Sequence, residues 1–402
     1  MNSYITEPAR KTAVTDRYDT VVAGGGVAGI SAALAAARGG ARVLLIEREY
    51  LLGGLATLGL VTIFLPLCDG MGRQVTYGIP EELLRLSVKY GFEDRDCTEW
   101  LNKNVEETDR PKTRFETQYN PNIFAISAEK LLKKAGVEIL FGTIVCDVLT
   151  SEGRITHLMV ENKSGRSAIA AKNVVDATGD ADICKQSHEN TATFGQGNVP
   201  AAWYYAAEDH EYRLRMLGYA DIPDSQKTEE QRKNAQNSVR FQGLCAKELS
   251  QLVGLSHQTL LKDFLKGGND SKNHALATVA TVPQIRMTRR IVGVYTQDDC
   301  EQHKEYADSV GLFSDWRKPG PVYELPFSCL HGKTVKNLIC AGRCISSTDA
   351  MWDITRVIPV CAVSGQAAGT AAAMTDDFPK VDLALLQENL KKSGVVLHER
   401  EL

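Results

Sequence analysis

The chain has 402 residues, a length typical of two or three domains, and its 46 lysines and arginines against 50 aspartates and glutamates leave a net charge of −4. This charge balance argues against a protein whose basic surface neutralises nucleic-acid phosphates. Hydrophobic residues make up 43% and charged residues 24%, which is typical of a soluble globular protein and not of a disordered or membrane-embedded one. The N-terminus, Met1-Asn2-Ser3-Tyr4, opens no apolar signal segment, so we expect a cytoplasmic protein.

The ten cysteines are scattered and contain no Cys-x-x-Cys pair; they stand at positions 68, 97, 146, 184, 245, 300, 329, 340, 344 and 361. The usual sequence signs of a zinc ribbon, a thioredoxin-type redox pair or a ferredoxin-like cluster are therefore missing. The eight histidines form no metal-ligand pairing either. We expect no metal site, and reduced cysteines that serve as small packing residues.

A strand, a helix and a second strand are predicted near the N-terminus. Residues 20–23 are β-branched and followed at once by glycines, residues 29–38 are small helix formers, and residues 42–46 form a second apolar run that ends at Glu47. This order within about 30 residues predicts a right-handed parallel βαβ unit.

The next elements are shorter and more polar. We expect a helix over 78–90, a surface loop over 100–119, a helix over 128–134, and strands over 137–140 and 145–149. Alternation over 155–160 and 167–171 predicts a small antiparallel pair, and residues 172–175 a separate strand before a glycine turn.

The second half of the chain is at first more polar and rich in loops, and then shows apolar strand and small-residue helix patterns like those near the N-terminus. We expect a strand over 201–205, a loop-rich stretch over 221–240, an amphipathic helix over 246–265, a strand over 289–295, a buried strand over 337–343 and a helix over 356–374. Asp353 and Thr355 are N-cap candidates for the last helix, and Pro359 suits its first turn. Gly365 and Gly369 fit close packing on the helix of residues 29–38 better than a membrane span.

The glycines between the first strand and helix match G-x-G-x-x-G. Gly24 permits the tight turn, Gly26 lets the backbone approach a pyrophosphate, and Gly29 lets the helix pack on the strand. The phosphate would then meet the helix N-terminus, and Glu47 ends the second strand where a carboxylate would bind ribose hydroxyls. The sequence therefore predicts a dinucleotide site.

Further segments point to the kind of dinucleotide. A second glycine pair, Gly53-Gly54, follows Glu47, and Ala177-Thr178-Gly179 and Ala341-Gly342-Arg343 end later apolar runs. Together with residues 355–369, these segments resemble the glutathione-reductase-type flavoproteins, in particular the bacterial FAD-dependent oxidoreductases related to fumarate reductase flavoproteins and thiazole-forming enzymes. Arg343 stands where many relatives have an aspartate.

The resemblance implies bound FAD and a Rossmann-like doubly wound α/β domain with an inserted α+β substrate domain. No second G-x-G-x-x-G lies in the middle of the chain, so an NAD(P)H domain is not expected there. We expect the FAD-binding domain over residues 1–184 and 335–402, and the substrate domain over 185–334. The expected FAD-binding residues are Gly24, Gly26, Val27, Ala28, Gly29, Glu47, Arg48, Gly53, Gly54, Leu55, Ala56, Thr57, Val145, Ala177, Thr178, Gly179, Asp180, Gly342, Arg343, Val357 and Ile358.

The residues that act on substrate are less clearly marked. Many relatives carry histidines where this chain has Asp349 and Trp352, so a histidine acid or base is excluded there. Arg286, Arg356, Asp349 and Asp353 remain as catalytic candidates. Arg289, Trp352, Tyr204 and His257 are candidates for substrate binding. For Arg286, Asp349 and Asp353 a purely structural role is equally open at this point.

We therefore expect an FAD-dependent oxidoreductase that transfers a hydride between a small polar or anionic organic molecule and flavin N5. A flavoprotein that acts on tRNA, a non-catalytic flavin-binding protein and, more weakly, a thiazole-forming enzyme are the alternatives. The expected partners are a small-molecule substrate and an electron donor or acceptor of unknown kind, without nucleic acid or membrane. The possibility of a homo-oligomer stays open.

Overall fold

The computed structural model describes residues 5–6, 8–91, 93, 97–102, 115–218, 227–233, 239–268 and 272–402. Its centre is a seven-stranded sheet in the order β5-β2-β1-β8-β7-β6, with β16 also paired to β8. The strands are β1 (Val14–Ala23), β2 (Val43–Ile46), β5 (Glu138–Leu140), β6 (Ile144–Ser151), β7 (Arg154–Asn162), β8 (Gly165–Asp176) and β16 (Leu338–Cys340).

Strand β8 joins two kinds of sheet. Its first half pairs antiparallel with β7, and its last residues, Val174–Asp176, pair in parallel with β16. Along its other edge β8 pairs in parallel with β1, which pairs in parallel with β2. The two separate strands expected over 167–171 and 172–175 are therefore wrong: they are one continuous strand, because β1 supports it along most of its length.

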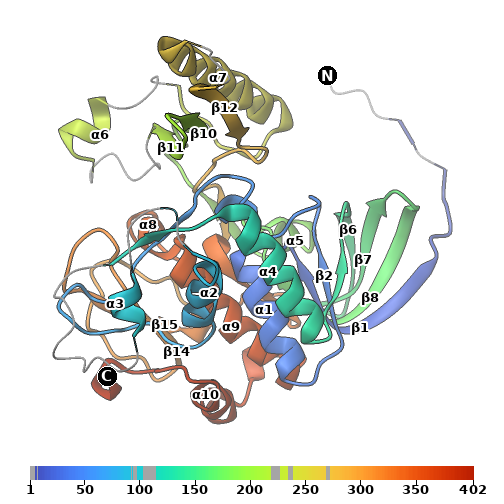
Figure 1. Ribbon diagram of the computed structural model, residues 1–402. Helices are drawn as coiled ribbons and strands as arrows, with labels where there is room; N and C mark the ends of the chain where they lie inside the picture. Colours follow the sequence, from blue (N-terminus) through green and yellow to red (C-terminus); the bar gives the residue numbers. More distant parts are fainter. Residues whose placement is uncertain are drawn as a thin grey trace.

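Two helices made of small residues pack beside this sheet. Helix α1 (Val27–Arg38) lies against α9 (Ile358–Met374), and Figure 1 shows the two helices next to each other. A Cβ atom on Gly365 would lie 2.3 Å from the Ala28 carbonyl oxygen, and one on Gly369 would lie 2.1 Å from that of Ala32. The expected packing of these glycines on the first helix is confirmed.

The helices around the sheet differ in part from the sequence expectation. Helix α4 (Pro121–Lys134) begins earlier than expected because the Asn120 side chain caps it by accepting from Asn122 N and Ile123 N. The helix expected over 356–374 is found as α9, and a further helix that was not expected, α8 (Asp349–Thr355), precedes it. The expected N-caps are wrong: α9 follows Val357, which makes no side-chain cap, while Asp353 and Thr355 lie within α8. Pro359 does lie in the first turn of α9, as expected.

A second, smaller unit lies apart from the main sheet, at the top of Figure 1. Strands β10 (Ala202–Glu208), β11 (Glu211–Leu217) and β12 (His274–Val279) form an antiparallel sheet, against which α7 (Ala246–Phe264) packs. Tyr204, Leu260 and Phe264 belong to the small core between sheet and helix. The middle of the chain thus contributes an α+β insertion, and the fold class is confirmed.

Further short elements complete the described parts of the chain. The helices are α2 (Ile79–Ser87), α3 (Thr98–Leu101), α5 (Asp182–Gln186), α6 (Glu229–Lys233) and α10 (Leu383–Lys392). Three pairs of short strands are also present: β3 (Ile63–Phe64) with β4 (Thr117–Gln118), β9 (Thr191–Thr193) with β13 (Arg289–Ile291), and β14 (Ser309–Ser314) with β15 (Val322–Pro326). The strand expected over 289–295 is found as the shorter strand β13. The loop expected over 100–119 has α3 at its start and β4 near its end. Residues 103–114 and most of 221–240 lie outside the described residues.

Strands β14 and β15 bear on the expected domain boundaries. They contribute to the main core beside α9, although they fall within the stretch expected to form the substrate domain.

Among the described helices, none is by itself long and apolar enough to cross a membrane. The pair α8 and α9, bent by 89°, meets that test only when both helices are taken together.

The close contact of α9 with α1 gives a test of the fold. We expect Gly369→Ala to lower the free energy of unfolding by about 1–3 kcal/mol, because its methyl group would overlap the Ala32 backbone. Gly254→Ala is the matched control, since Gly254 also lies inside a helix but has open space around its Cβ position. We expect this control to be neutral or to stabilise by up to about 1 kcal/mol. Urea unfolding of both variants measures the difference, and equal effects would contradict the packing account.

Candidate active site

A cavity of about 240 Å³ lies where the carboxyl ends of the parallel strands meet the N-termini of α1 and α9. This is the edge at which open α/β sheets bind ligands. The lining residues are Ala23, Gly24, Gly26, Val27, Ala28, Ile46, Glu47, Arg48, Glu49, Gly53, Gly54, Leu55, Ala56, Thr143, Ile144, Val145, Ala177, Thr178, Gly179, Asp180, Asp182, Ile183, Val282, Ala341, Gly342, Arg343, Arg356, Ile358 and Cys361.

The three motif glycines stand in three different environments. Gly24 has a φ of +104°, and a Cβ there would lie 2.4 Å from the Ala177 carbonyl oxygen. A Cβ on Gly29 would lie 1.8 Å from the Gly24 carbonyl oxygen. Gly26 has no heavy atom within 4 Å of its Cβ position and faces the cavity. The first glycine therefore permits the turn, the third permits close packing, and the second leaves room for a ligand.

Glu47 follows β2 and presents a fixed carboxylate to the cavity. Its Oε2 accepts a hydrogen bond from Gly25 N at 2.7 Å, and its Oε1 accepts one from Glu49 N at 2.9 Å. Burial raises the pKa of Glu47, and these two backbone donors act in the opposite direction. Each oxygen keeps a further lone pair, so the carboxylate can still accept from ribose hydroxyls.

Arg343 fixes one wall of the cavity. Its guanidinium donates to the Gly179 carbonyl oxygen at 2.7 Å, to the Ile285 carbonyl oxygen at 2.6 Å, and to Asp180 Oδ1 at 2.7 Å. Asp180 Oδ1 also accepts from Thr288 Oγ1 at 2.6 Å. The residue that replaces the aspartate of many relatives thus connects the turn after β8 to the segment that contains Arg286.

Arg356 and Asp353 form a buried ion pair at the start of α9. Arg356 lines the cavity, and its Nη2 donates to Asp353 Oδ1. Asp353 is fully buried, and burial raises the pKa of its carboxyl group. Arg317 Nη1 lies 3.8 Å from Asp353 Oδ2 on the other side. Asp353 therefore positions a guanidinium that faces the cavity.

Arg286 lies behind this wall and is buried, with 4% of its surface exposed. Its guanidinium stacks over the Trp203 ring at 5.1 Å. Among the described residues, neither Nε nor Nη2 has a hydrogen-bond acceptor. Burial and the nearby charges of Arg356 and Arg343 lower its pKa, yet a guanidinium stays protonated near neutral pH. The three guanidinium groups are matched by only two carboxylates, Asp180 and Asp353.

The cavity brings together most residues expected to bind FAD. Gly29, Thr57 and Val357 do not line it: Gly29 packs on the turn, Thr57 donates to the Leu52 carbonyl oxygen, and Val357 is the N-cap of α9. The individual roles of all these residues stay predictions.

The residues expected to bind substrate or to act in catalysis are spread more widely around the cavity than those expected to bind FAD. Only Arg356 lines the cavity, while Arg289 is held at its edge by the Asp180 carbonyl oxygen and Asp182. Trp352 is buried and donates to the Arg343 carbonyl oxygen. Tyr204 donates to Asp263 Oδ2 at 3.0 Å beneath α7.

Two further candidates lie away from the cavity. His257 is exposed on α7. Asp349 begins α8, whose N-cap is Thr348, and it faces Gly195 and Arg290.

Sequence reasoning missed some cavity residues because they belong to no motif. They are Ala23, Ile46, Glu49, Thr143, Ile144, Asp182, Ile183, Val282, Ala341 and Cys361. Five of these ten are direct chain neighbours of expected residues and four more lie two or three positions from one, so a wider window around each motif would have found them. Val282 would not have been found in this way, since only folding brings its segment to the cavity.

The residues present fit an anionic dinucleotide. The N–H groups in the first turn of a helix have no carbonyl of a preceding turn to bind, and two such turns, those of α1 and α9, reach this cavity. The open side of Gly26 and the guanidinium of Arg343 add space and positive charge.

The family model for FAD dependent oxidoreductases matches residues 19–252 and 185–390. The chain therefore belongs to the FAD dependent oxidoreductase family. This is a family of oxidoreductases, and its cofactor is FAD.

A vinyl phenol reductase from Lactiplantibacillus plantarum is 26% identical over 246 residues, which cover 52% of this chain and 50% of the relative. The chain thus spans about half the length of this curated relative. Among solved structures, a geranylgeranyl bacteriochlorophyll reductase-like protein from Thermoplasma acidophilum has a TM-score of 0.48 at 13% identity, over 94% of this chain and 82% of that chain. A 3-ketosteroid-delta4-(5alpha)-dehydrogenase from Rhodococcus jostii has a TM-score of 0.43 at 16% identity, over 90% and 98%.

The different environments of two motif glycines give a test of the cofactor site. We expect Gly26→Ala to leave the free energy of unfolding of the apoprotein within about 0.5 kcal/mol of wild type, since the methyl group points into the cavity. Its FAD affinity should fall at least about tenfold, or about 1.4 kcal/mol. Gly24→Ala should instead destabilise the apoprotein by about 1–3 kcal/mol, because of its positive φ and its contact with Ala177. Flavin titration and urea unfolding separate the two effects, and wild-type affinity in Gly26→Ala would contradict this assignment.

Proposed function

We propose that this protein transfers a hydride between a small anionic or polar organic molecule and the flavin of its FAD. When bound, FAD supplies the hydride donor or acceptor at N5. The chain's own residues bind and orient the substrate, exclude water and stabilise charge.

The observation that carries this proposal is the unmatched positive charge of Arg286. A buried charge without a partner is strongly unfavourable, so a guanidinium with unbonded N–H groups, placed behind the lining residues Arg343 and Arg356, favours an anionic ligand in this cavity. A carboxylate or phenolate that enters beside Arg356 and Arg343 would supply the missing negative charge. The planar guanidinium also favours two-point binding of a carboxylate.

Arg356 is proposed to touch the substrate or flavin, and Asp353 to position it. The ion pair holds the Arg356 side chain in one rotamer at the cavity wall, and Arg317 supports Asp353 from behind. Arg289 is proposed to help hold the cavity wall in place without touching the substrate, through its contacts with Asp180 and Asp182.

We propose that the unit formed by β10, β11, β12 and α7 covers the substrate; it lies within the stretch 185–334, whose strands β14 and β15 belong to the main core. The stacking of Arg286 on Trp203, the second residue of β10, supports this role for the unit. The net charge of −4 favours a small-molecule substrate over tRNA. The vinyl phenol reductase relative supports testing alkenes conjugated to a phenol or carboxylate first, in the direction of reduction.

The experiment is an anaerobic screen of the purified, FAD-loaded protein. Dithionite-reduced enzyme is mixed with enoates, vinyl phenols and keto acids, and oxidised enzyme with hydroxy acids, amines and sugars. Flavin reoxidation or bleaching by anionic compounds, and none by neutral analogues of equal size, is the expected result. A preference for cationic or neutral substrates would overturn the proposal.

Arg286→Met tests the charge directly. We expect the variant to fold with full FAD content and with equal or higher stability, because an unmatched buried charge is removed while the unbranched apolar part of the side chain is kept. Its affinity for the anionic substrate should fall by about 2–3 kcal/mol, or roughly 30–150-fold. Arg290→Met is the control, since Arg290 Nε also lacks an acceptor among the described residues, but its guanidinium lies over Trp352 and near Asp349, not near Arg343 and Arg356. Unchanged KM in Arg286→Met would refute the role of Arg286.

Asp353→Asn tests the positioning of Arg356. Without the carboxylate the guanidinium loses its ion pair, so we expect kcat to fall about 10–100-fold while FAD content is retained. The stability should fall by about 1–3 kcal/mol, since a buried arginine loses its partner. Asp349→Asn should have a smaller effect, because Asp349 contacts neither Arg356 nor the cavity lining. Stopped-flow flavin kinetics measures both variants, and a larger defect in Asp349→Asn would reverse the assignment.

A further inference from the structure

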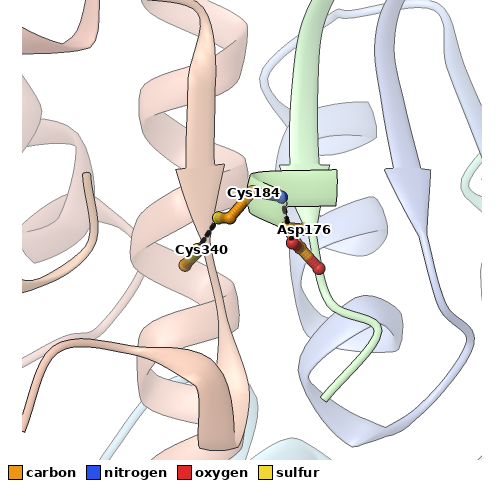
Figure 2. Close-up of side chains that lie close together, drawn as sticks. All are labelled: Asp176, Cys184 and Cys340. Carbon is orange, nitrogen blue, oxygen red and sulfur yellow. Dashed lines mark hydrogen bonds between the residues drawn. The ribbon is translucent and has the colours of Figure 1, made fainter. Parts of the chain in front are cut away.

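Three potential metal ligands from distant parts of the chain meet behind the cavity wall. Asp176 ends β8, Cys184 lies in α5, and Cys340 ends β16. Figure 2 shows the thiols of Cys184 and Cys340 turned toward each other, with their Sγ atoms 3.2 Å apart, and the Asp176 carboxylate next to the Cys184 backbone nitrogen. One ligand atom from each residue lies within 4.8 Å of both others. All three residues are fully buried.

The Asp176 carboxylate is held in place but is not neutralised. Its Oδ1 accepts from Thr178 Oγ1 at 2.7 Å and from Thr178 N at 3.1 Å, and its Oδ2 accepts from Cys184 N at 3.0 Å. Within the described ranges, no lysine, arginine or histidine forms an ion pair with it. A fully buried carboxylate without a counter-ion is unfavourable, and two thiols beside it can add further negative charge when a cation is present.

We infer that Asp176, Cys184 and Cys340 form a binding site for a zinc ion. Thiolate sulfur and carboxylate oxygen are both zinc ligands, at about 2.3 Å and 2.0–2.2 Å, so two ligands of one tetrahedral ion lie about 4 Å apart or less. The observed arrangement needs only small side-chain movements to reach these distances. Binding of Zn²⁺ releases the two thiol protons to solvent and leaves both sulfurs as thiolates.

The surroundings also suit a metal site. The Thr178 and Cys184 hydrogen bonds orient the carboxylate in the way that outer-shell groups orient metal ligands. A third thiol, that of Cys344, lies nearby and faces the Asp176 carbonyl oxygen at 3.4 Å and the Ala341 carbonyl oxygen at 3.3 Å. Cys344 is not in the group whose ligand atoms lie within 4.8 Å of one another, so it would have to turn toward the other three to complete a tetrahedron.

Zinc at this site would act on the cofactor cavity through the backbone. Each ligand is the direct chain neighbour of a cavity-lining residue: Asp176 precedes Ala177, Cys184 follows Ile183, and Cys340 precedes Ala341. The ion would therefore tie the ends of β8 and β16 and the start of α5 to one point. We expect its removal to weaken FAD binding about 10–100-fold without touching the substrate side of the cavity.

The test measures metal in the FAD-loaded protein, purified under reducing conditions without chelator. Elemental mass spectrometry should find one zinc ion per chain in wild type and in Cys68→Ser, a control cysteine that is equally buried but outside the cluster. Cys184→Ser and Cys340→Ser should each lose most of it. Wild-type zinc content in either cluster variant would overturn the site.

A second measurement does not depend on how the variants fold. Chelator-treated wild-type protein, checked for retained helix content, is titrated with Zn²⁺ by calorimetry in two buffers of different ionisation enthalpy. The expected result is one tight site with release of about two protons, together with recovery of FAD affinity. No binding, or a Cys184–Cys340 disulfide found by mass spectrometry in the freshly reduced protein, would refute the inference. Both measurements are independent of substrate turnover, so the proposed oxidoreductase reaction could fail while the zinc site stands, and the reverse.

Discussion

The backbones of α1 and α9 touch because each helix carries only small side chains at the contact. Gly365 and Gly369 face the carbonyl groups of Ala28 and Ala32 at distances that exclude any side chain. This contact sets the N-termini of two helices, one from each end of the chain, at the same cavity. Their unbonded N–H groups make the site suitable for an anionic dinucleotide before any charged side chain is considered.

The same cavity is bordered by two unmatched buried charges of opposite sign. Arg286 lies on the side of the inserted unit, and Asp176 lies behind the ends of the parallel strands. They are separated by the wall that Arg343 and Asp180 hold together. One charge is suited to an anionic substrate, the other to a cation that stabilises the wall, and their different positions keep the two proposals independent.

Local patterns predicted the part of the fold that local contacts determine. The unit β1–α1–β2, the roles of Gly24 and Gly29, and the helix α7 all follow from short windows of sequence. The continuous strand β8 did not, because its length depends on pairing with β1. The hydrogen bonds of Arg343 to residues 179 and 285 depend in the same way on contacts across more than fifty positions.

The cysteines illustrate this limit most clearly. Spacing rules such as Cys-x-x-Cys recognise only neighbours in the sequence, whereas Cys184 and Cys340 stand 156 residues apart and meet through the pairing of β16 with β8.

Because β16 and α9 come from the last part of the chain, the ribosome completes most of the protein before the sheet and the α1 contact can close. The N-terminal βαβ unit therefore leaves the ribosome before the helix that covers its alanine-rich face, and this non-local contact closes late.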